Sequence, residues 1–208
     1  AQLAALFGCA VMTGVGAVVN TAKVAPGMPV AVFGMGGVGL STVLGARAAG
    51  AYPIIAVDIL EDKLALAREL GATFTVNAAH DDPVEAIRTL TSGGARYAFE
   101  SVGSEKVLAQ AYQATRRGGT TVTMGLPHPS KQLSIPAVSL VAEERVLMGS
   151  YMGSAVPRRD IPRFLALYKA GLLPVDRLHT HTIALDAINP AFDALAQGLA
   201  VRQLIQLA

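Results

Sequence analysis

The chain has few of the features that mark membrane, secreted or disulfide-rich proteins. It contains one cysteine, Cys9, which excludes an internal disulfide and suits a reducing compartment. No apolar run approaches the ~20 residues that span a bilayer, and the first residues lack the charged region and cleavage site of a signal peptide. The sequence therefore predicts a cytoplasmic protein with no membrane partner.

The chain also lacks a large excess of either charge, because its 17 lysines and arginines nearly balance its 15 aspartates and glutamates. Basic residues do not cluster with interleaved aromatic residues, and tryptophan is absent. Nucleic acid is therefore not an expected partner. What the chain does have is a hydrophobic fraction of 52% over 208 residues, which is enough to bury a substantial core.

The most informative stretch runs from residue 30 to residue 40. A short apolar, β-branched run over 30–33 leads into Gly34, Gly36 and Gly39 at the spacing G-x-G-x-x-G, and an Ala- and Leu-rich segment follows. The first glycine permits a tight turn, the second lets a pyrophosphate approach the backbone, and the third lets a helix pack closely on the strand. Free N–H groups at the helix start would then face the phosphates.

A second apolar run, residues 54–57, ends at Asp58, which lies 19 residues after Gly39. At that position a carboxylate is expected to accept both ribose hydroxyls of an adenosine. The alternative role is a helix N-cap for the segment that starts near Glu61, and the two roles are compatible. Strand, glycines, helix, strand and acid in this order predict a dinucleotide site.

Strands and helices alternate through the rest of this region. We expect a helix over 4–25 broken at Gly14 and Gly16, a turn over 25–29 and a Pro-rich loop over 127–136. The other predicted helices are 61–70, 83–91, 105–115, 157–170 and 187–197, and the other predicted strands are 73–76, 95–100, 120–124, 146–152 and 202–207, with a polar stretch over 178–183. Alternation predicts an α/β fold with a doubly wound, six-stranded parallel sheet of the Rossmann type.

Several segments together resemble the zinc-dependent medium-chain alcohol dehydrogenases. They are residues 8–14, the three glycines, Val57-Asp58, residues 70–72, Phe99-Glu100 and Val201-Arg202. The resemblance implies a remnant of a catalytic domain over 1–13, an NAD-binding domain over 14–152 and a segment over 153–208 that returns toward the catalytic domain. It also implies that the catalytic domain is missing, so that zinc is bound only by the intact oxidoreductase, with Cys9 as one ligand. No catalytic residue is predicted in this chain.

The resemblance assigns roles that each have a simpler alternative. Thr13 would lie beside the nicotinamide or be an ordinary helix hydroxyl, and Lys63 would reach the ribose or be solvated. Arg202 would bind the pyrophosphate or form a surface ion pair. The predicted cofactor-binding set is Thr13, Gly34, Met35, Gly36, Gly37, Val38, Gly39, Asp58, Lys63, Val102, Met124, Leu126, Ser150, Met152 and Arg202, with Cys9 as the predicted metal ligand.

The expected cofactor is NAD, because Asp58 would repel a 2′-phosphate and is followed by Ile59 and Leu60 instead of a basic residue. The alternatives are a zinc-free, quinone reductase-like NADPH oxidoreductase, a non-catalytic dinucleotide-binding module, a nucleoside-dependent methyltransferase and a purely structural role. The substrate expected from the resemblance is a small alcohol or aldehyde.

The apolar strand over 146–152 is expected at the sheet edge, where its unpaired backbone groups would join a second copy in a two-fold homodimer. The alternative is that the loop over 127–144 covers this edge.

Overall fold

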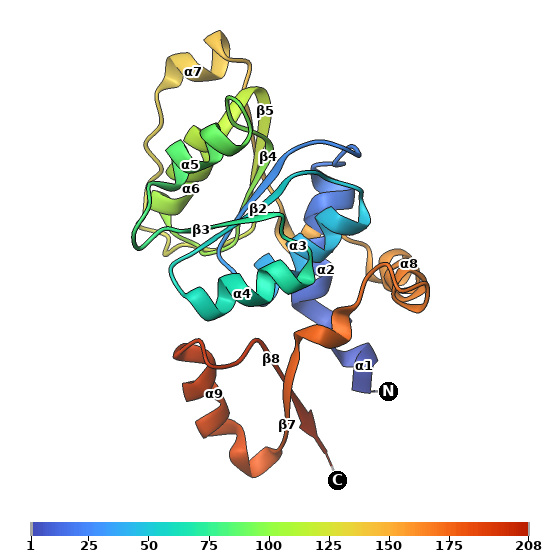
Figure 1. Ribbon diagram of the computed structural model, residues 1–208. Helices are drawn as coiled ribbons and strands as arrows, with labels where there is room; N and C mark the ends of the chain where they lie inside the picture. Colours follow the sequence, from blue (N-terminus) through green and yellow to red (C-terminus); the bar gives the residue numbers. More distant parts are fainter. Residues whose placement is uncertain (1, 208) are drawn as a thin grey trace.

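The computed structural model describes residues 2–207 and shows a parallel sheet with helices on both faces (Figure 1). The strand order is β3-β2-β1-β4-β5-β6, and every neighbouring pair is parallel. The strands are β1 Val30–Phe33, β2 Ile54–Asp58, β3 Phe74–Asn77, β4 Ala95–Glu100, β5 Thr115–Thr123 and β6 Val146–Gly149. This arrangement confirms the predicted doubly wound sheet.

The helices connect the strands and begin and end at recognisable residues. Asp82 caps one of them by accepting the N–H of Val84 at 2.8 Å, and Gly71, with φ of 121°, ends another. The α-helices are α1 Gln2–Ala5, α2 Met12–Gly16, α3 Gly37–Ala48, α4 Glu61–Leu70, α5 Pro83–Leu90, α6 Glu105–Ala114, α7 Ala137–Ala142, α8 Pro157–Lys169 and α9 Ile188–Ala196. The π-helical turns are η1 Phe7–Val11 and η2 Ala17–Thr21, and the 3-10 turns are η3 Tyr151–Ser154, η4 Val175–Leu178 and η5 Leu185–Ala187.

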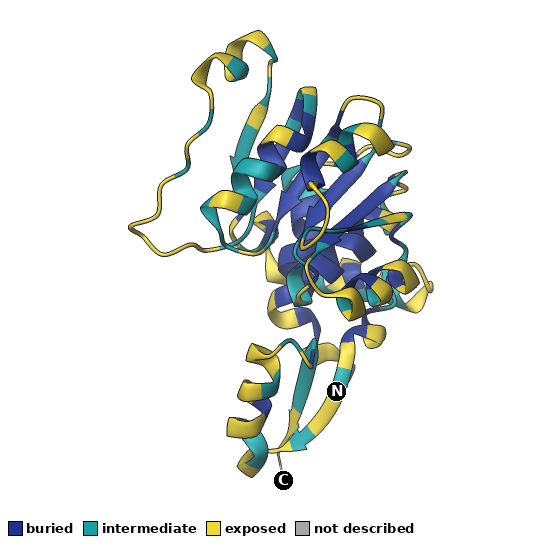
Figure 2. Cartoon of the chain, turned by 60° about the vertical axis from the view of Figure 1, so that its left-hand side comes forward, coloured by how far each residue is buried: buried dark blue, intermediate teal, exposed yellow. Residues whose placement is uncertain are grey.

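The sheet is buried on both faces, as a parallel sheet with apolar strands should be. In β1, Val30 and Val32 join the hydrophobic cluster that includes residues of α3 and α4, whereas Ala31 and Phe33 join the cluster that includes residues of α5 and α6. Figure 2 shows this buried interior and the more exposed segments around it. The alternation of side chains along each strand therefore fixes which helix covers which face.

The expected break at Gly14 and Gly16 is wrong, because the chain stays helical from η1 through η2. A Cβ on Gly14 would lie 2.4 Å from the carbonyl oxygen of Val38, and one on Gly16 would lie 2.5 Å from that of Gly153. These glycines thus permit close packing of the helix and do not interrupt it. The sixth strand also ends earlier than expected, at Gly149, and α7 forms just after the predicted Pro-rich loop, within the longer loop expected over 127–144.

The last part of the chain divides between the main body and a small lobe. Phe164, Leu173 and Val175 are fully buried in the cluster under the sheet, so α8 and η4 belong to the body. Beyond them, β7 His179–Ala184 and β8 Arg202–Gln206 form a parallel two-stranded sheet, with α9 between them in sequence (Figure 1). The predicted boundaries after residues 13 and 152 stay predictions.

Among the helices of residues 2–207, none combines the length and hydropathy required to cross a bilayer.

Candidate functional site

The carboxyl ends of the strands meet at one edge of the sheet, and most of the predicted site residues lie there. Gly34 follows β1, Asp58 ends β2, Glu100 ends β4, Met124 follows β5 and Ser150 follows β6. In a doubly wound sheet this edge is the place where ligands bind.

The glycine-rich loop has the geometry that its spacing predicts. Gly34 has φ of +89°, a conformation that glycine adopts at little cost. A Cβ on Gly39 would lie 1.7 Å from the carbonyl oxygen of Gly34, so no side chain fits between α3 and β1. Gly36 precedes the first turn of α3 in extended conformation, with no side-chain cap. The N–H groups of this helix start are therefore left for a ligand.

Arg202 lies against this helix start. A Cβ on Gly37 would be 2.9 Å from Nε of Arg202, which places the guanidinium beside the first residue of α3. Within residues 2–207 this guanidinium makes no ion pair or hydrogen bond. It lines a hollow of about 390 Å³ together with Gly36, Val38, Asp58 and Lys63. Two positive groups, the guanidinium and the helix end, thus face one hollow, which favours an anion there.

Asp58 ties the second strand to the glycine-rich loop. Its Oδ2 accepts the N–H of Met35 at 2.6 Å, and its Oδ1 accepts the N–H groups of Ile59 at 2.8 Å and Leu60 at 3.0 Å. The carboxylate therefore holds the turn before α4. None of these three hydrogen bonds comes from an N–H group within α4 itself. A carboxylate can accept about four hydrogen bonds, and three of these sites are already taken, so roughly one is left for a ribose hydroxyl. A second hydroxyl could bind only if the Met35 N–H gave up its bond to Asp58.

Lys63 joins α4 to the segment before β8. Its Nζ donates to the carbonyl oxygen of Ala200 at 3.3 Å. Burial lowers the pKa of Lys63, while the nearby carboxylates of Asp58 and Asp62 act in the opposite direction. Lys63 is therefore half-buried in the wall of the hollow and is not the freely solvated lysine of the simpler alternative.

A second, largely apolar hollow of about 340 Å³ lies on the other side of Asp58 and Leu60. Its walls include Ile59, Val102 and Val107, and the first two of these side chains are exposed. A flat aromatic group fits between such aliphatic walls. Sequence reasoning used Ile59 and Leu60 only to choose between cofactors and did not identify this slot.

Glu100 is a site residue that sequence reasoning missed. Its carboxylate is buried, and Oε1 accepts the N–H groups of Val102 at 2.7 Å and Gly103 at 2.6 Å. Its Oε2 accepts the hydroxyl of Thr123 at 2.7 Å. One carboxylate therefore joins the loop that follows β4 to the end of β5, and the available signal was an acid directly after the apolar residues Tyr97, Ala98 and Phe99.

The residues predicted beside the nicotinamide lie around α2 and α3. The hydroxyl of Thr13 is 3.9 Å from the sulfur of Met152, and the sulfur of Met124 is 4.0 Å from the hydroxyl of Thr42. Ser150 is buried and shares a hydrogen bond of 2.7 Å with Thr21. Leu126 is separate from this group: its side chain is exposed, while its backbone lies beside Gly103.

Cys9 is an exposed free thiol on the same helical run as Thr13. In the part of the chain that the structure describes, no three side chains of His, Cys, Asp or Glu gather in a way that could hold a metal ion. A catalytic zinc requires three protein ligands. The donors described here therefore do not fit a complete zinc site, and Cys9 supplies at most one ligand.

The glycine-rich turn, the positively charged hollow and the apolar slot, together at one edge of the sheet, are features of a cofactor-binding domain of the doubly wound class. The family model described as zinc-binding dehydrogenase matches residues 37–170, and the chain belongs to this family.

A curated relative, the S-(hydroxymethyl)glutathione dehydrogenase of Paracoccus denitrificans, is 38% identical over 207 residues, which cover 96% of this chain and 55% of the relative. An alcohol dehydrogenase zinc-binding domain protein from Burkholderia ambifaria has a TM-score of 0.97 and 39% identity over 100% of this chain and 56% of that one. The benzyl alcohol dehydrogenase of Acinetobacter calcoaceticus has a TM-score of 0.95 and 37% identity, and the match covers 97% of this chain and 56% of that one. The chain thus spans about half the length of these relatives and matches their cofactor-binding half.

Proposed function

We propose that this chain is the NAD-binding part of a zinc-dependent alcohol dehydrogenase. The observation that supports this most strongly is the guanidinium of Arg202 beside the uncapped start of α3, over a glycine turn that excludes any side chain. An anion in this hollow would meet backbone N–H groups and a bidentate cation. A dinucleotide has such an anion in its pyrophosphate.

The neighbouring groups fit the other parts of the same ligand. Asp58 and Lys63 would bind the adenosine ribose, and the slot lined by Ile59 and Val102 would hold the adenine. Thr13 and Met152 would position the nicotinamide, which accepts a hydride when the cofactor is bound. The protein's part in this is to bind and orient, because hydride transfer requires the reacting carbon and the ring at close distance.

NAD is proposed over NADP on the same geometry. The Asp58 carboxylate already accepts three backbone N–H groups, and the residues after it, Ile59 and Leu60, carry no charge. A 2′-phosphate would meet a carboxylate with no compensating cation on this loop.

We also propose that the intact protein binds a catalytic zinc through Cys9 and through ligands outside this chain, acts on a primary alcohol or its aldehyde, and is cytoplasmic. The names of the relatives support the substrate class, and the single cysteine supports the compartment.

We propose a homodimer formed through β6. This strand ends the sheet, and Val146 and the nearby Tyr151 are exposed. Among the described hydrogen bonds, those that join α7 and its flanks to other elements reach α6 and β5, for example Ser139 to Tyr112 at 2.6 Å and Arg117 to the carbonyl oxygen of Ala142 at 2.9 Å. The alternative in which this loop covers the edge is therefore the less supported one.

Calorimetric titration of the chain with NADH, NADPH and ADP-ribose tests the central proposal. We expect NADH and ADP-ribose to bind, and NADPH to bind at least tenfold more weakly than NADH. If neither NADH nor ADP-ribose binds at millimolar concentration, the chain is not a dinucleotide-binding domain and the proposal is wrong.

A further inference from the structure

The turn η3 has an unusual backbone conformation. Met152, Gly153 and Ser154 have φ values of 51°, 69° and 47°, so three successive residues are left-handed and two of them are not glycine. L-residues adopt this conformation only where the surrounding structure holds them in it. The structure must therefore contain groups that hold this turn.

One side of the turn is held by the helix that carries Thr13. A Cβ on Gly153 would lie 2.4 Å from the carbonyl oxygen of Met12 and 2.7 Å from that of Thr13. Gly16 meets the same turn, as described above. This close approach brings the sulfur of Met152 to the hydroxyl of Thr13.

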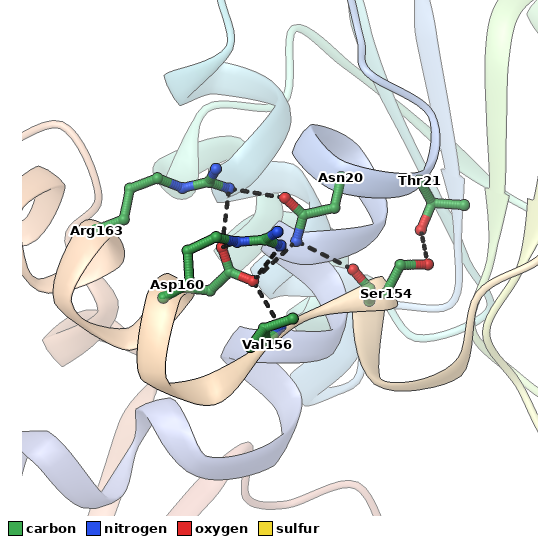
Figure 3. A network of polar contacts seen from close by, with 8 residues as sticks. Asn20, Thr21, Ser154, Val156, Asp160 and Arg163 are labelled. Atoms are coloured by element: carbon green, nitrogen blue, oxygen red, sulfur yellow. Dashed lines mark hydrogen bonds and ion pairs between the residues drawn. The ribbon is translucent and has the colours of Figure 1, made fainter.

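The other side is held by Asn20 and Asp160 (Figure 3). The Asn20 amide donates to the carbonyl oxygen of Gly153 and to Oδ2 of Asp160, both at 3.3 Å. Oδ2 of Asp160 also accepts the N–H of Val156 at 2.8 Å. One carboxylate oxygen is thus bonded directly to Val156, two residues after the left-handed turn, and is linked through Asn20 to Gly153 inside it.

Asp160 itself is fully buried and well supplied with donors. Arg159 donates to its two oxygens at 3.0 and 2.8 Å, and Arg163 lies 3.6 Å from Oδ1. Arg163 also donates to the Asn20 amide oxygen at 2.9 Å, which fixes the amide nitrogen toward Gly153. Capping of α8 alone would require only the bond from Val156. The contact with Asn20, which lies 140 positions earlier in the chain, goes beyond a local cap.

We propose that Asp160 is a positioning residue for the nicotinamide side of the cofactor site, acting through Asn20 and Val156 on the turn that carries Met152. This inference rests on the proposed function. It predicts that Asp160 affects the binding of the nicotinamide end of the cofactor and leaves the adenosine diphosphate end unaffected.

The test compares NADH with ADP-ribose, which lacks the nicotinamide and carries a similar charge. In Asp160→Asn the amide retains one acceptor oxygen, and its NH₂ group opposes the donors of Arg159 and Asn20. We expect the dissociation constant of NADH to rise at least fivefold and that of ADP-ribose to change less than twofold. Equal weakening of both ligands would show a general structural role and overturn the proposal.

Two further variants keep the test decisive if Asp160→Asn does not fold. Asn20→Ala removes the link to Gly153 but leaves Asp160 bonded to Arg159 and Val156, and it should weaken NADH selectively by at least threefold. The matched control Asp176→Asn removes an exposed carboxylate on η4 and should change neither constant. If the unmodified chain binds neither ligand, the proposed function fails and this inference fails with it. If the unmodified chain binds both equally, the turn does not contact the ring and only this inference fails.

Discussion

Arg202 allows a prediction in which stability and binding change in opposite directions. The guanidinium lies beside Gly37 at the positive end of α3, and it has no acidic partner among residues 2–207. Without a bound anion this placement is unfavourable, by about 0.3–1 kcal/mol for a charge of the wrong sign at a helix end. Arg202→Gln should therefore raise the free energy of unfolding by a few tenths of a kcal/mol and the melting temperature by roughly 1–3 °C.

The same substitution should weaken the binding of the dinucleotide. A charged hydrogen-bonding group contributes about 1.5–3 kcal/mol, which corresponds to a rise of roughly 10- to 100-fold in the dissociation constant of NADH. The binding of ADP-ribose should weaken by the same factor, because ADP-ribose also contains the pyrophosphate. Titration calorimetry and thermal unfolding at low ionic strength measure the two effects on one sample.

The matched control is Arg158→Gln, which removes an exposed arginine at the second position of α8. It should relieve a similar helix-end repulsion and leave both dissociation constants unchanged. A variant at Arg202 that melts at a lower temperature and binds NADH normally would refute the assignment, because Arg202 would then be a structural residue.

Three further predictions concern the cofactor, the metal and the assembly. Asp58→Ala should weaken the binding of NADH about tenfold and reduce the preference of the chain for NADH over NADPH. Tighter binding of NADPH than of NADH by the unmodified chain would contradict the NAD assignment. After dialysis the chain should retain less than about 0.1 zinc per molecule and oxidise neither ethanol nor benzyl alcohol, whereas one bound zinc with turnover would mean that the ligands have been misplaced. Leu147→Lys or Tyr151→Lys should convert a dimer into a monomer in sedimentation with NADH binding preserved, and an unmodified chain that stays monomeric at high concentration would exclude the interface.

The parts of this molecule that sequence reasoning predicted are those determined by short segments. A turn with φ of +89° needs glycine at position 34, and apolar runs followed by periodic helices fix the order of strands and helices. The carboxylate at Asp58 follows its strand directly, so its place at the sheet edge needs no knowledge of distant contacts.

The parts that were missed depend on contacts between distant segments. Gly14 and Gly16 look like helix breakers in sequence, yet they touch Val38 and Gly153. Lys63 is half-buried because a lobe that begins more than a hundred residues later supplies the carbonyl group of Ala200. Glu100 joins two strands only because Thr123, at the end of the neighbouring β5, donates to the carboxylate that also accepts the nearby Gly103 N–H. Periodicity and spacing carry no record of such pairings.

The buried Asp160 allows a last prediction, on acid stability. Hydrogen bonds from Arg159 hold the pKa of Asp160 below its ordinary value, with further support from the Val156 N–H and from Arg163 and with burial acting against them. Because the unfolded chain binds a proton more readily than the folded one, this carboxylate stabilises the fold fully above its unfolded pKa of about 4, and the contribution is lost as the pH falls toward the folded value. Urea unfolding of the chain and of Asp160→Asn at pH 7, 5, 4 and 3.5 should give free energies that converge below pH 4. If the difference between the two proteins is the same at every pH, the carboxylate does not titrate with folding, and the charge of Asp160 is not what holds the left-handed turn.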